Sequence, residues 1–482
     1  MKKIYFSIFT LLLVVLAFNF SQAQVFTGDW STEYVTDDNA ANGTGYQTIA
    51  VGPIADNNFV ALVNHQESDA ANHSYYIVGY KNADSSNGRM WTVEYAPKGL
   101  LTSWSQGFTR IDLLDANDLD ATPASLVFVA NNDAQNNILV FELTDTELLP
   151  TQYKLATQNG YQWAIDTDAD GRVYVTKIDT AANQSSVAVY DNFANEPFWT
   201  NYFSAPPTPL TEIILPDPGE ARGIAVSEDG SSIWVSNWDS KKVYKYVGDP
   251  VNGYTPDNGF SLITDGIYYS PVPDTFAVGP YGMEYIDSKG ILCLANDSDF
   301  GNDYEYGRIY LANSETGSIE DTINVAEWNY SVEGSYANHS TGIASGYTST
   351  YDVAVDPDLN VYSQSFYGWT VEKWVYSETL PVLTDIKEIS GLVPDEFSLS
   401  QNYPNPFNPS TSIEFSINEL SNVSLDIYTI TGELVGSLIS GKEFAAGTYK
   451  VSFDASRLSS GIYLYSLRAG NNTLTRKMTL IK

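Results

Sequence analysis

The chain has 482 residues, of which 43 % are hydrophobic and 13 % aromatic, and its formal net charge is −35. The apolar content suffices for large cores and argues against a wholly disordered chain. The acidic balance disfavours partners such as nucleic acid and anionic membranes, because both would be repelled at long range. The single cysteine, Cys293, excludes an intramolecular disulfide, and its place between leucines predicts a buried strand residue.

The N-terminal residues have the pattern of a secretory signal peptide. Lys2 and Lys3 precede an apolar run over 4–18, and Ser21 and Ala23 supply small residues before a cleavage site. We therefore predict a signal peptide over 1–23. No later stretch reaches eighteen apolar residues, so no transmembrane segment is expected in the mature chain.

Residues 24–380 carry a repeated pattern of short strands. Gly223–Gly230 leads into strands over 232–236 and 242–247, and the same order recurs from Trp163, Gly282 and Tyr351. With weaker copies near 48 and 110, the copies recur about every 60 residues and have the Asp-Gly turns typical of an all-β propeller. We predict six blades, or seven if one copy is degenerate. The repeat resembles the NHL and YVTN-type propeller repeats, and this resemblance implies a fold and no chemistry.

The segment Trp30–Val35 lies before the first copy and alternates like a strand. We expect it to form the outer strand of the last blade. Such pairing would close the ring and cover an edge that otherwise exposes backbone donors and acceptors.

In a propeller, the loops between the second and third strands of each blade share one face with the loops that join consecutive blades. We call this the B–C/D–A face, and the opposite one the A–B face. Polar and aromatic residues recur in the predicted B–C loops, and we interpret them as a ligand-binding face. For any single Asn or Asp, turn formation is the alternative. The residues are His65, Asn131, Asp133, Asn237, Trp238, Asp239, Asn296, Asp297, Asp299 and Trp369.

Residues suited to acid–base chemistry are expected on the same face. A polysaccharide lyase needs a cation beside the uronate carboxylate and a His or Tyr base. Arginines and tyrosines precede predicted inner strands, and two histidines lie near the ring closure. The catalytic candidates are Arg110, Arg222, His73, His339, Tyr281 and Tyr351. The sequence has no P-loop, GxSxG, HExxH or CxxC motif, so it fixes no reaction.

Propeller lactonases of the gluconolactonase type bind a metal through Glu, Asn and Asp where inner strands begin. At the best matching register this chain has Arg222 and Tyr281 instead. These departures argue against that activity.

On the A–B face, Asp166, Asp168 and Asp170 form a DxDxDG pattern that ends at Gly171. Alternate carboxylates before a glycine are how calcium loops gather oxygen ligands. The twelfth position is Lys177 instead of Glu, so the loop is not an EF-hand. A structural calcium and a plain acidic hairpin turn both remain open, and no other cofactor is indicated.

The C-terminal part follows a predicted linker over 381–396. Residues 397–482 contain six alternating segments that predict a small immunoglobulin-like β-sandwich. They begin with the motif Asn402, Tyr403, Pro404, Asn405, Pro406, Phe407, Asn408 and Pro409. This region resembles the type A C-terminal sorting domain of the type IX secretion system of Bacteroidetes and related bacteria. The resemblance implies recognition by that machinery, and export through the periplasm to the outer cell surface or the medium.

The charge distribution supports an extracellular binding role over nucleic-acid contact. Residues 25–393 hold 15 Lys and Arg against 51 Asp and Glu, so the acidity belongs to the predicted propeller. We expect a secreted or surface propeller that binds a carbohydrate, peptide or surface polymer. The alternative is a glycan-active enzyme such as a propeller polysaccharide lyase, and the sequence leaves open whether the protein is an enzyme.

Overall fold

The structure of the protein is a computed structural model. Its described part is almost entirely β, with one α-helix, α1 (Val325–Glu333). The structure describes residues 26–35, 45–54, 58–66, 74–80, 118–122, 126–133, 136–143, 148–155, 161–195, 208–264, 278–298, 306–333, 349–366, 370–383, 386–390, 394, 396–408, 410–432, 434–444, 446–455, 458–470 and 472–481.

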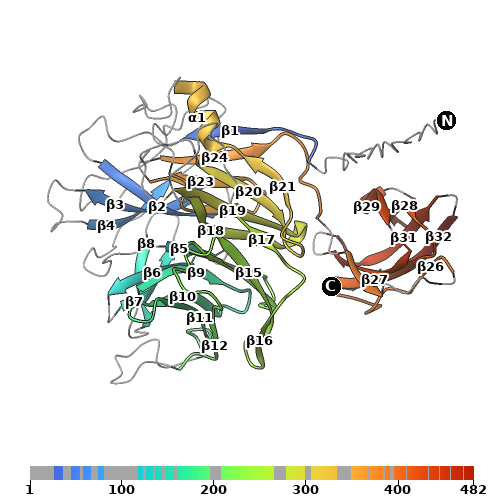
Figure 1. Ribbon diagram of the computed structural model, residues 1–482, viewed down its shortest axis with the longest axis horizontal. Helices are drawn as coiled ribbons and strands as arrows, with labels where there is room; N and C mark the ends of the chain where they lie inside the picture. The colour runs from blue at the N-terminus through green and yellow to red at the C-terminus, as the bar shows by residue number, and fades with distance from the viewer. Residues whose placement is uncertain are drawn as a thin grey trace, which may run out of the picture.

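In the first domain, antiparallel sheets follow one another from residue 45 onward, each built from consecutive strands, and the last of them also includes a strand from the chain start (Figure 1). The first sheet contains β2 (Gly45–Ile54), β3 (Asn58–Gln66) and β4 (Ser74–Tyr80). The second contains β5 (Asp118–Ala121), β6 (Leu126–Asp133), β7 (Asn136–Leu143) and β8 (Leu148–Leu155). The third contains β9 (Tyr161–Thr167), β10 (Val173–Asp179), β11 (Gln184–Tyr190) and β12 (Thr211–Ile214).

The next sheets repeat this order. The fourth contains β13 (Gly223–Val226), β14 (Ser232–Asn237) and β15 (Lys242–Asp249), with β16 (Gly253–Pro256) and β17 (Leu262–Ile263) both paired to β15. The fifth contains β18 (Val278–Ile286), β19 (Ile291–Ser298), β20 (Arg308–Asn313) and β21 (Ile319–Ile323). The sixth contains β22 (Val353–Val355), β23 (Val361–Ser365), β24 (Thr370–Tyr376) and, at its outer edge, β1 (Trp30–Val35).

The innermost strands of these sheets contact one another in a closed cycle, in the order β2, β5, β9, β13, β18, β22 and back to β2. A ring of antiparallel sheets around one axis is a β-propeller, so the predicted fold class is confirmed. Residues 81–117 lie outside the described part, and the count of six blades against seven remains a prediction.

Hydrophobic cores lie between neighbouring sheets. Leu62 of β3 shares a cluster with Val127 of β6, and Val187 of β11 shares another with Ile233 of β14. Cys293 of β19 is fully buried in the cluster between the fifth and sixth sheets. This burial raises the pKa of its thiol, which therefore stays protonated and acts as a packing residue.

The strand β1 closes the ring as expected from the sequence. It pairs antiparallel with β24, from Trp30 opposite Tyr376 to Val35 opposite Glu372. The preceding Phe26 is fully buried and makes an edge contact with the Tyr376 ring, with 5.8 Å between ring centroids. The chain start therefore contributes backbone pairing and core packing to the last sheet.

The C-terminal domain is a β-sandwich. One sheet has the order β25 (Ile386–Ser390), β30 (Gly447–Asp454), β27 (Ser410–Ile417) and β26 (Ser398–Leu399). The other has the order β29 (Leu434–Phe444), β28 (Ser421–Thr429), β31 (Gly461–Ala469) and β32 (Asn472–Leu480). Phe415, Val451 and Tyr465 lie in the core shared by the two sheets.

The segment between the two domains contacts both of them. Leu380 and Leu383 are buried in the propeller core between the fifth and sixth sheets, and Lys289 donates from Nζ to the Leu380 carbonyl at 2.8 Å. The strand β25 lies within the predicted linker, yet it pairs with β30 of the sandwich. No helix among the described residues has the length and apolar character needed to cross a membrane.

Candidate functional site

An arginine enclosed by aromatic rings lies on the B–C/D–A face. Arg222 immediately precedes β13 and donates from Nη1 to the Tyr281 hydroxyl at 2.8 Å. It also donates from Nε to Glu220 Oε2 at 2.8 Å. Its guanidinium carbon lies 4.8, 4.6 and 5.1 Å from the ring centroids of Trp163, Trp238 and Tyr281. Together, cation–π contacts and charge-assisted hydrogen bonds fix the planar group.

The turn between β14 and β15 presents Trp238. The side chain of Asn237 accepts a hydrogen bond from the backbone N–H three residues later, at 2.9 Å, and Asp239 accepts one from the Glu220 N–H at 2.8 Å. The Lys241 ammonium lies 3.2 Å from the Trp238 ring centroid. Asn237 and Asp239 thus shape the turn, while Trp238 remains partly exposed.

The rings continue into the fifth and sixth sheets. Tyr281 stacks on Tyr351, with centroids 4.5 Å apart and planes 28° apart, and Tyr351 lies 5.5 Å from Phe366. Trp238 meets Tyr281 edge-on at 6.3 Å. The connected residues come from four consecutive sheets, and we call them the aromatic cluster: Trp163, Arg222, Trp238, Tyr281, Tyr351 and Phe366.

Polar groups without partners lie beside this cluster. Asn296 near the end of β19 and Gln364 near the end of β23 have buried amide nitrogens and oxygens that make no hydrogen bond with any described residue. Next to Asn296, Asp297 accepts a hydrogen bond from the Thr350 N–H at 2.6 Å, and burial raises the pKa of Asp297 to about 7. Such buried amides normally bind ordered water or the polar groups of a ligand.

The structure therefore unites part of the predicted set. Arg222, Trp238, Tyr281 and Tyr351 meet in one cluster, with Asn296 and Asp297 nearby. Asn131 and Asp133 lie in β6 of the second sheet, and His65 lies in β3 of the first sheet, so these three residues belong to other blades than the cluster. His73, Arg110, Asp299, His339 and Trp369 lie outside the described residues, as does Pro409 of the sorting motif.

The predicted loop position is wrong for six residues, which lie within strands instead: His65 in β3, Asn131 and Asp133 in β6, Asn237 in β14, and Asn296 and Asp297 in β19. Asn131 and Asn296 lie inside strands β6 and β19, and both are fully buried. The ladder continues past these polar residues, with Asn296 paired to Pro280 and to Arg308. The predicted strands were too short, because their ends were placed where the alternation of apolar residues stops.

A cavity of about 960 Å³ lies on the opposite side, where the inner strands meet the A–B loops. Among the described residues that line it, acids are frequent and no Lys, Arg or His occurs. The acids are Asp118, Asp120, Asp166, Asp168, Asp170, Glu228, Glu284, Asp287, Asp352 and Asp356.

Enclosure by the sheets makes these carboxyls hard to ionise. Burial raises the pKa of Asp118 well above its usual range, and the charge of Asp352 adds to the effect. Burial also raises the pKa of Asp120 to about 6 and that of Asp352 to about 7. For Asp166 and Glu284, burial is again the main cause of a raised pKa, and neighbouring carboxylates are the second.

Three of these acids also join the blades. Asp352 accepts a hydrogen bond from the Val51 N–H at 3.0 Å, and Asp118 accepts one from the Ile165 N–H at 2.9 Å. Asp166 accepts one from the Val226 N–H at 2.7 Å. Each bond runs from one inner strand to the inner strand of the next sheet, so these carboxyls have a structural role.

The sequence reasoning did not single out Asp118, Asp120, Glu284 and Asp352. A usable signal existed, because Asp118, Asp120 and Glu284 lie in innermost strands beside apolar residues, and Asp352 immediately precedes the innermost strand β22. Acids placed in buried strands of several copies of one repeat indicate an acidic axis.

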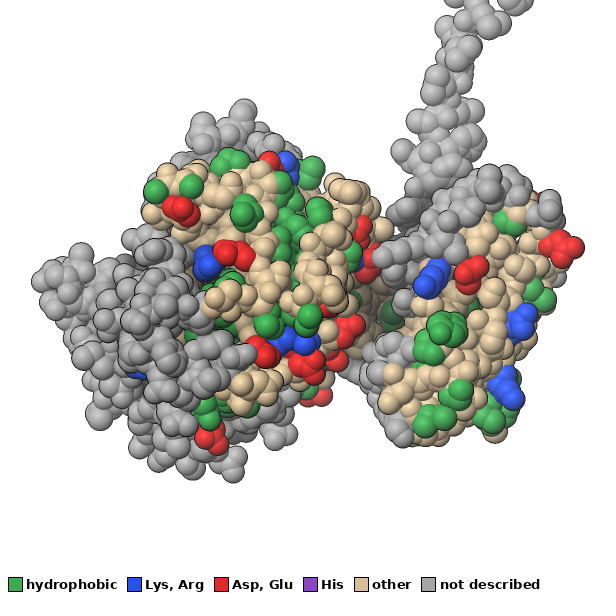
Figure 2. All heavy atoms as spheres, turned by 90° about the horizontal axis from the view of Figure 1, so that it is seen from below, with side chains coloured by type: hydrophobic (Ala, Val, Ile, Leu, Met, Phe, Trp, Pro, Cys, Tyr) green, Lys and Arg blue, Asp and Glu red, His purple; other side chains and the backbone are tan. Residues whose placement is uncertain are grey.

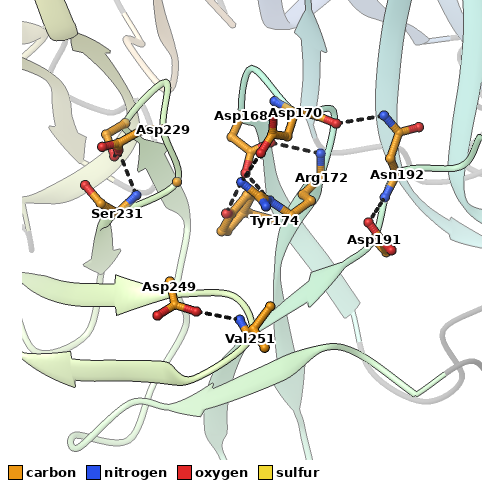
Figure 3. Close-up of polar contacts among 12 residues, drawn as sticks. Asp168, Asp170, Arg172, Tyr174, Asp191, Asn192, Asp229, Ser231, Asp249 and Val251 are labelled. Atoms are coloured by element: carbon orange, nitrogen blue, oxygen red, sulfur yellow. Dashed lines mark hydrogen bonds and ion pairs between the residues drawn. The ribbon is translucent and has the colours of Figure 1, made fainter. Parts of the chain in front are cut away.

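The DxDxDG loop is bound by protein groups (Figure 3). Asp168 accepts hydrogen bonds from the Asp170 and Arg172 N–H groups at 3.0 Å each, from Arg172 Nε at 2.6 Å and from the Tyr174 hydroxyl at 2.8 Å. Asn192 donates to the Asp170 carbonyl at 2.7 Å. Gly171, with φ +74°, completes the turn. Across the described residues, no group of three His, Cys, Asp or Glu side chains is placed to hold a metal ion.

Comparison with known proteins identifies the C-terminal part. Residues 401–482 match the family model of the secretion system C-terminal sorting domain. No curated protein matches the sequence.

Solved structures give distant likenesses to the fold. PorZ of Porphyromonas gingivalis, an essential bacterial surface component of the type-IX secretion system, is 10 % identical with a TM-score of 0.34. That alignment covers 91 % of this chain but only 60 % of PorZ. A gluconolactonase from Xanthomonas campestris is 12 % identical, with 73 % and 91 % of the chains covered and a TM-score of 0.38. TM-scores this low carry no argument about activity.

The fold and the matched tail together define the class: a β-propeller joined to a type IX C-terminal sorting domain. A chain of this class is exported to the cell surface or the extracellular space.

Proposed function

We propose that the protein is an extracellular or cell-surface propeller that binds a ligand through the aromatic cluster. The ligand classes are a carbohydrate, a peptide or a surface polymer. The observation that carries the proposal is the continuity of the cluster, from Trp163 to Phe366, over four sheets. The rings of Trp163, Trp238, Tyr351 and Phe366 are partly exposed and are held by packing, so they offer a rigid apolar surface at low entropic cost.

The surrounding chemistry favours a neutral carbohydrate among these classes. Pyranose rings stack on aromatic faces such as those of Trp238 and Tyr351, which are partly exposed. A polyanion would be repelled by the acidic propeller. Figure 2 shows Asp and Glu side chains gathered on the side of the propeller nearer the sandwich.

Binding can be tested with the purified full chain and a polysaccharide panel. Laminarin and xylan represent neutral polymers, alginate represents a polyuronate, and affinity electrophoresis measures retention. Trp238→Ala should weaken retention of a neutral polymer about tenfold, because it removes a surface ring. Ile214→Ala is the matched control, since Ile214 is exposed on the outer strand β12. Equal retention of both variants and the parent would contradict the proposal.

A glycan-active enzyme, such as a polysaccharide lyase, is the second candidate. The observation in its favour is the 2.8 Å bond between Arg222 and the Tyr281 hydroxyl, which places a cation against a potential base. Lyase products absorb near 235 nm, and glycosidase products are reducing ends. Either product, lost in Tyr281→Phe, would replace the binding-only interpretation with the enzymatic one.

We also infer that export proceeds by way of the periplasm after removal of residues 1–23. The proposal rests on the signal-peptide pattern and on the sorting domain. Mass spectrometry of the exported protein should find Gln24 at its N-terminus, and an intact Met1 would contradict this route.

A further inference from the structure

The sorting motif combines buried residues that hold the sandwich together with an exposed tyrosine. Asn402 is buried, and its amide donates to the Pro404 carbonyl at 3.0 Å and to Thr411 Oγ1 at 2.9 Å. Phe407 is buried in the sandwich core and lies 6.2 Å from the Phe453 ring. These side chains fix the path of the motif.

The motif also covers the outer edge of β32, the last strand of its sheet. The Phe407 N–H donates to the Thr479 carbonyl, and the Ile481 N–H donates to the Phe407 carbonyl, both at 3.0 Å. Asn405 Oδ1 accepts a hydrogen bond from the Thr479 N–H at 3.0 Å, and Gln401 Nε2 donates to the Lys477 carbonyl at 2.8 Å. Because these backbone groups of β32 are already hydrogen-bonded, the edge strand cannot pair with another chain at these positions.

Tyr403 differs from these neighbours. Its side chain is 82 % exposed, although its N–H and C=O are both bonded to Ser412 at 2.9 Å. The flanking Pro404 and Pro406 are exposed too, and proline fixes their φ angles. A large ring on an immobile backbone loses little entropy when a partner covers it, which is typical of residues that anchor protein interfaces.

We propose that Tyr403 is the recognition residue of the sorting signal, and that its ring enters a pocket on the protein of the type IX machinery that receives this domain. Asn402, Asn405 and Phe407 are positioning residues that hold Tyr403 in place. A protein partner fits better than a membrane, because stable membrane attachment needs a broader apolar face or a basic patch.

The test uses the full chain expressed in a bacterium with a type IX secretion system. Tyr403→Ala should reduce the exported fraction, in medium and on the surface, at least fivefold, and the protein should accumulate in the periplasm. Tyr403→Phe, which keeps the ring, should restore export. The matched control is Ile430→Ala, because Ile430 is 62 % exposed on the same sandwich and lies outside the motif. This control should be exported like the parent.

Stability separates recognition from folding. Scanning calorimetry of the purified full chains should show a sandwich transition within about 1 °C of the parent for Tyr403→Ala, and lowered by about 5 °C for Asn402→Ala. Normal export of Tyr403→Ala would overturn the proposal, as would a loss of export shared by Ile430→Ala. A Tyr403→Ala transition lowered as far as that of Asn402→Ala would also overturn it, because the ring would then be structural. Self-association of the parent that Tyr403→Ala abolishes, with export unchanged, would assign the ring to a second copy instead.

Discussion

At one end of the propeller, Arg222 lies among aromatic rings that reach across four sheets. At the other end, the inner strands surround a cavity whose described lining has many acids and no basic side chain. Both ends are built by the same strand repeat. A concave, acidic cavity can thus have a structural role, since Asp118, Asp166 and Asp352 already bond backbone groups of the next sheet.

Tyr351 and Asp352 give the sharpest test of this contrast, because they are adjacent in sequence and belong to the cluster and the cavity respectively. Tyr351→Ala should weaken binding of a retained polysaccharide at least tenfold, since it removes the ring stacked on Tyr281. Asp352→Asn should leave binding unchanged, because Asn can still accept the Val51 N–H bond. Calorimetric titration measures both. A larger loss of binding in Asp352→Asn than in Tyr351→Ala would indicate that the ligand binds in the cavity.

The pH dependence of stability should report the cavity. The raised pKa values of Asp120, near 6, and Asp352, near 7, mean that the folded state binds protons more tightly than the unfolded state. This stabilisation is complete below about pH 4 and is lost as pH rises through 6–7. We expect the propeller to melt about 4 °C lower at pH 8 than at pH 5. A melting temperature that rises over this interval would show that other groups dominate.

Removing one of these acids should reduce the change in melting temperature between pH 5 and pH 8. Asp120→Asn eliminates a titrating group, while the amide oxygen can still accept the Thr167 hydroxyl bond, 2.6 Å long in the parent. We expect the variant to melt about 2 °C above the parent at pH 8 and to match it at pH 5. Asp249→Asn is the control, because Asn252 holds the pKa of this exposed carboxyl below its usual range. Differential scanning fluorimetry at both pH values measures this difference. An equal change in melting temperature for the parent and Asp120→Asn would show that Asp120 does not contribute.

Raising the salt concentration should have the smallest effect on the stability of the propeller. The propeller carries most of the charge of a chain with a net charge of −35, and self-repulsion between exposed carboxylates weakens as salt rises. Raising NaCl from 0.05 to 0.5 M should increase the propeller melting temperature by about 1–2 °C at pH 8. A decrease would indicate that attractive surface ion pairs outweigh the repulsion.

The sequence was sufficient where a local pattern determines the outcome. The alternation of Trp30–Val35 predicts the closing strand, and the repeat register predicts that Arg222, Tyr281 and Tyr351 lie on one face. The motif from Asn402 onward predicted the sorting domain that the family comparison supports.

Other features depend on contacts that a local pattern cannot show. Asn296 is buried because neighbouring blades enclose the end of β19. Its polar side chain predicted an exposed position instead. Glu284 and Asp118 belong to one cavity only after the ring closes. The strand β25 seemed to be linker, because its partner β30 lies about 60 residues further along the chain.

Hydroxyl-radical footprinting of the full chain, with and without its tightest-binding polysaccharide, would show directly which end of the propeller the ligand covers. Binding at the aromatic cluster predicts protection of Trp238, Tyr351 and Phe366, with unchanged oxidation of Phe193 and Tyr285, which line the cavity. Protection of Phe193 and Tyr285, with Trp238 and Tyr351 oxidised as in the free protein, would contradict it.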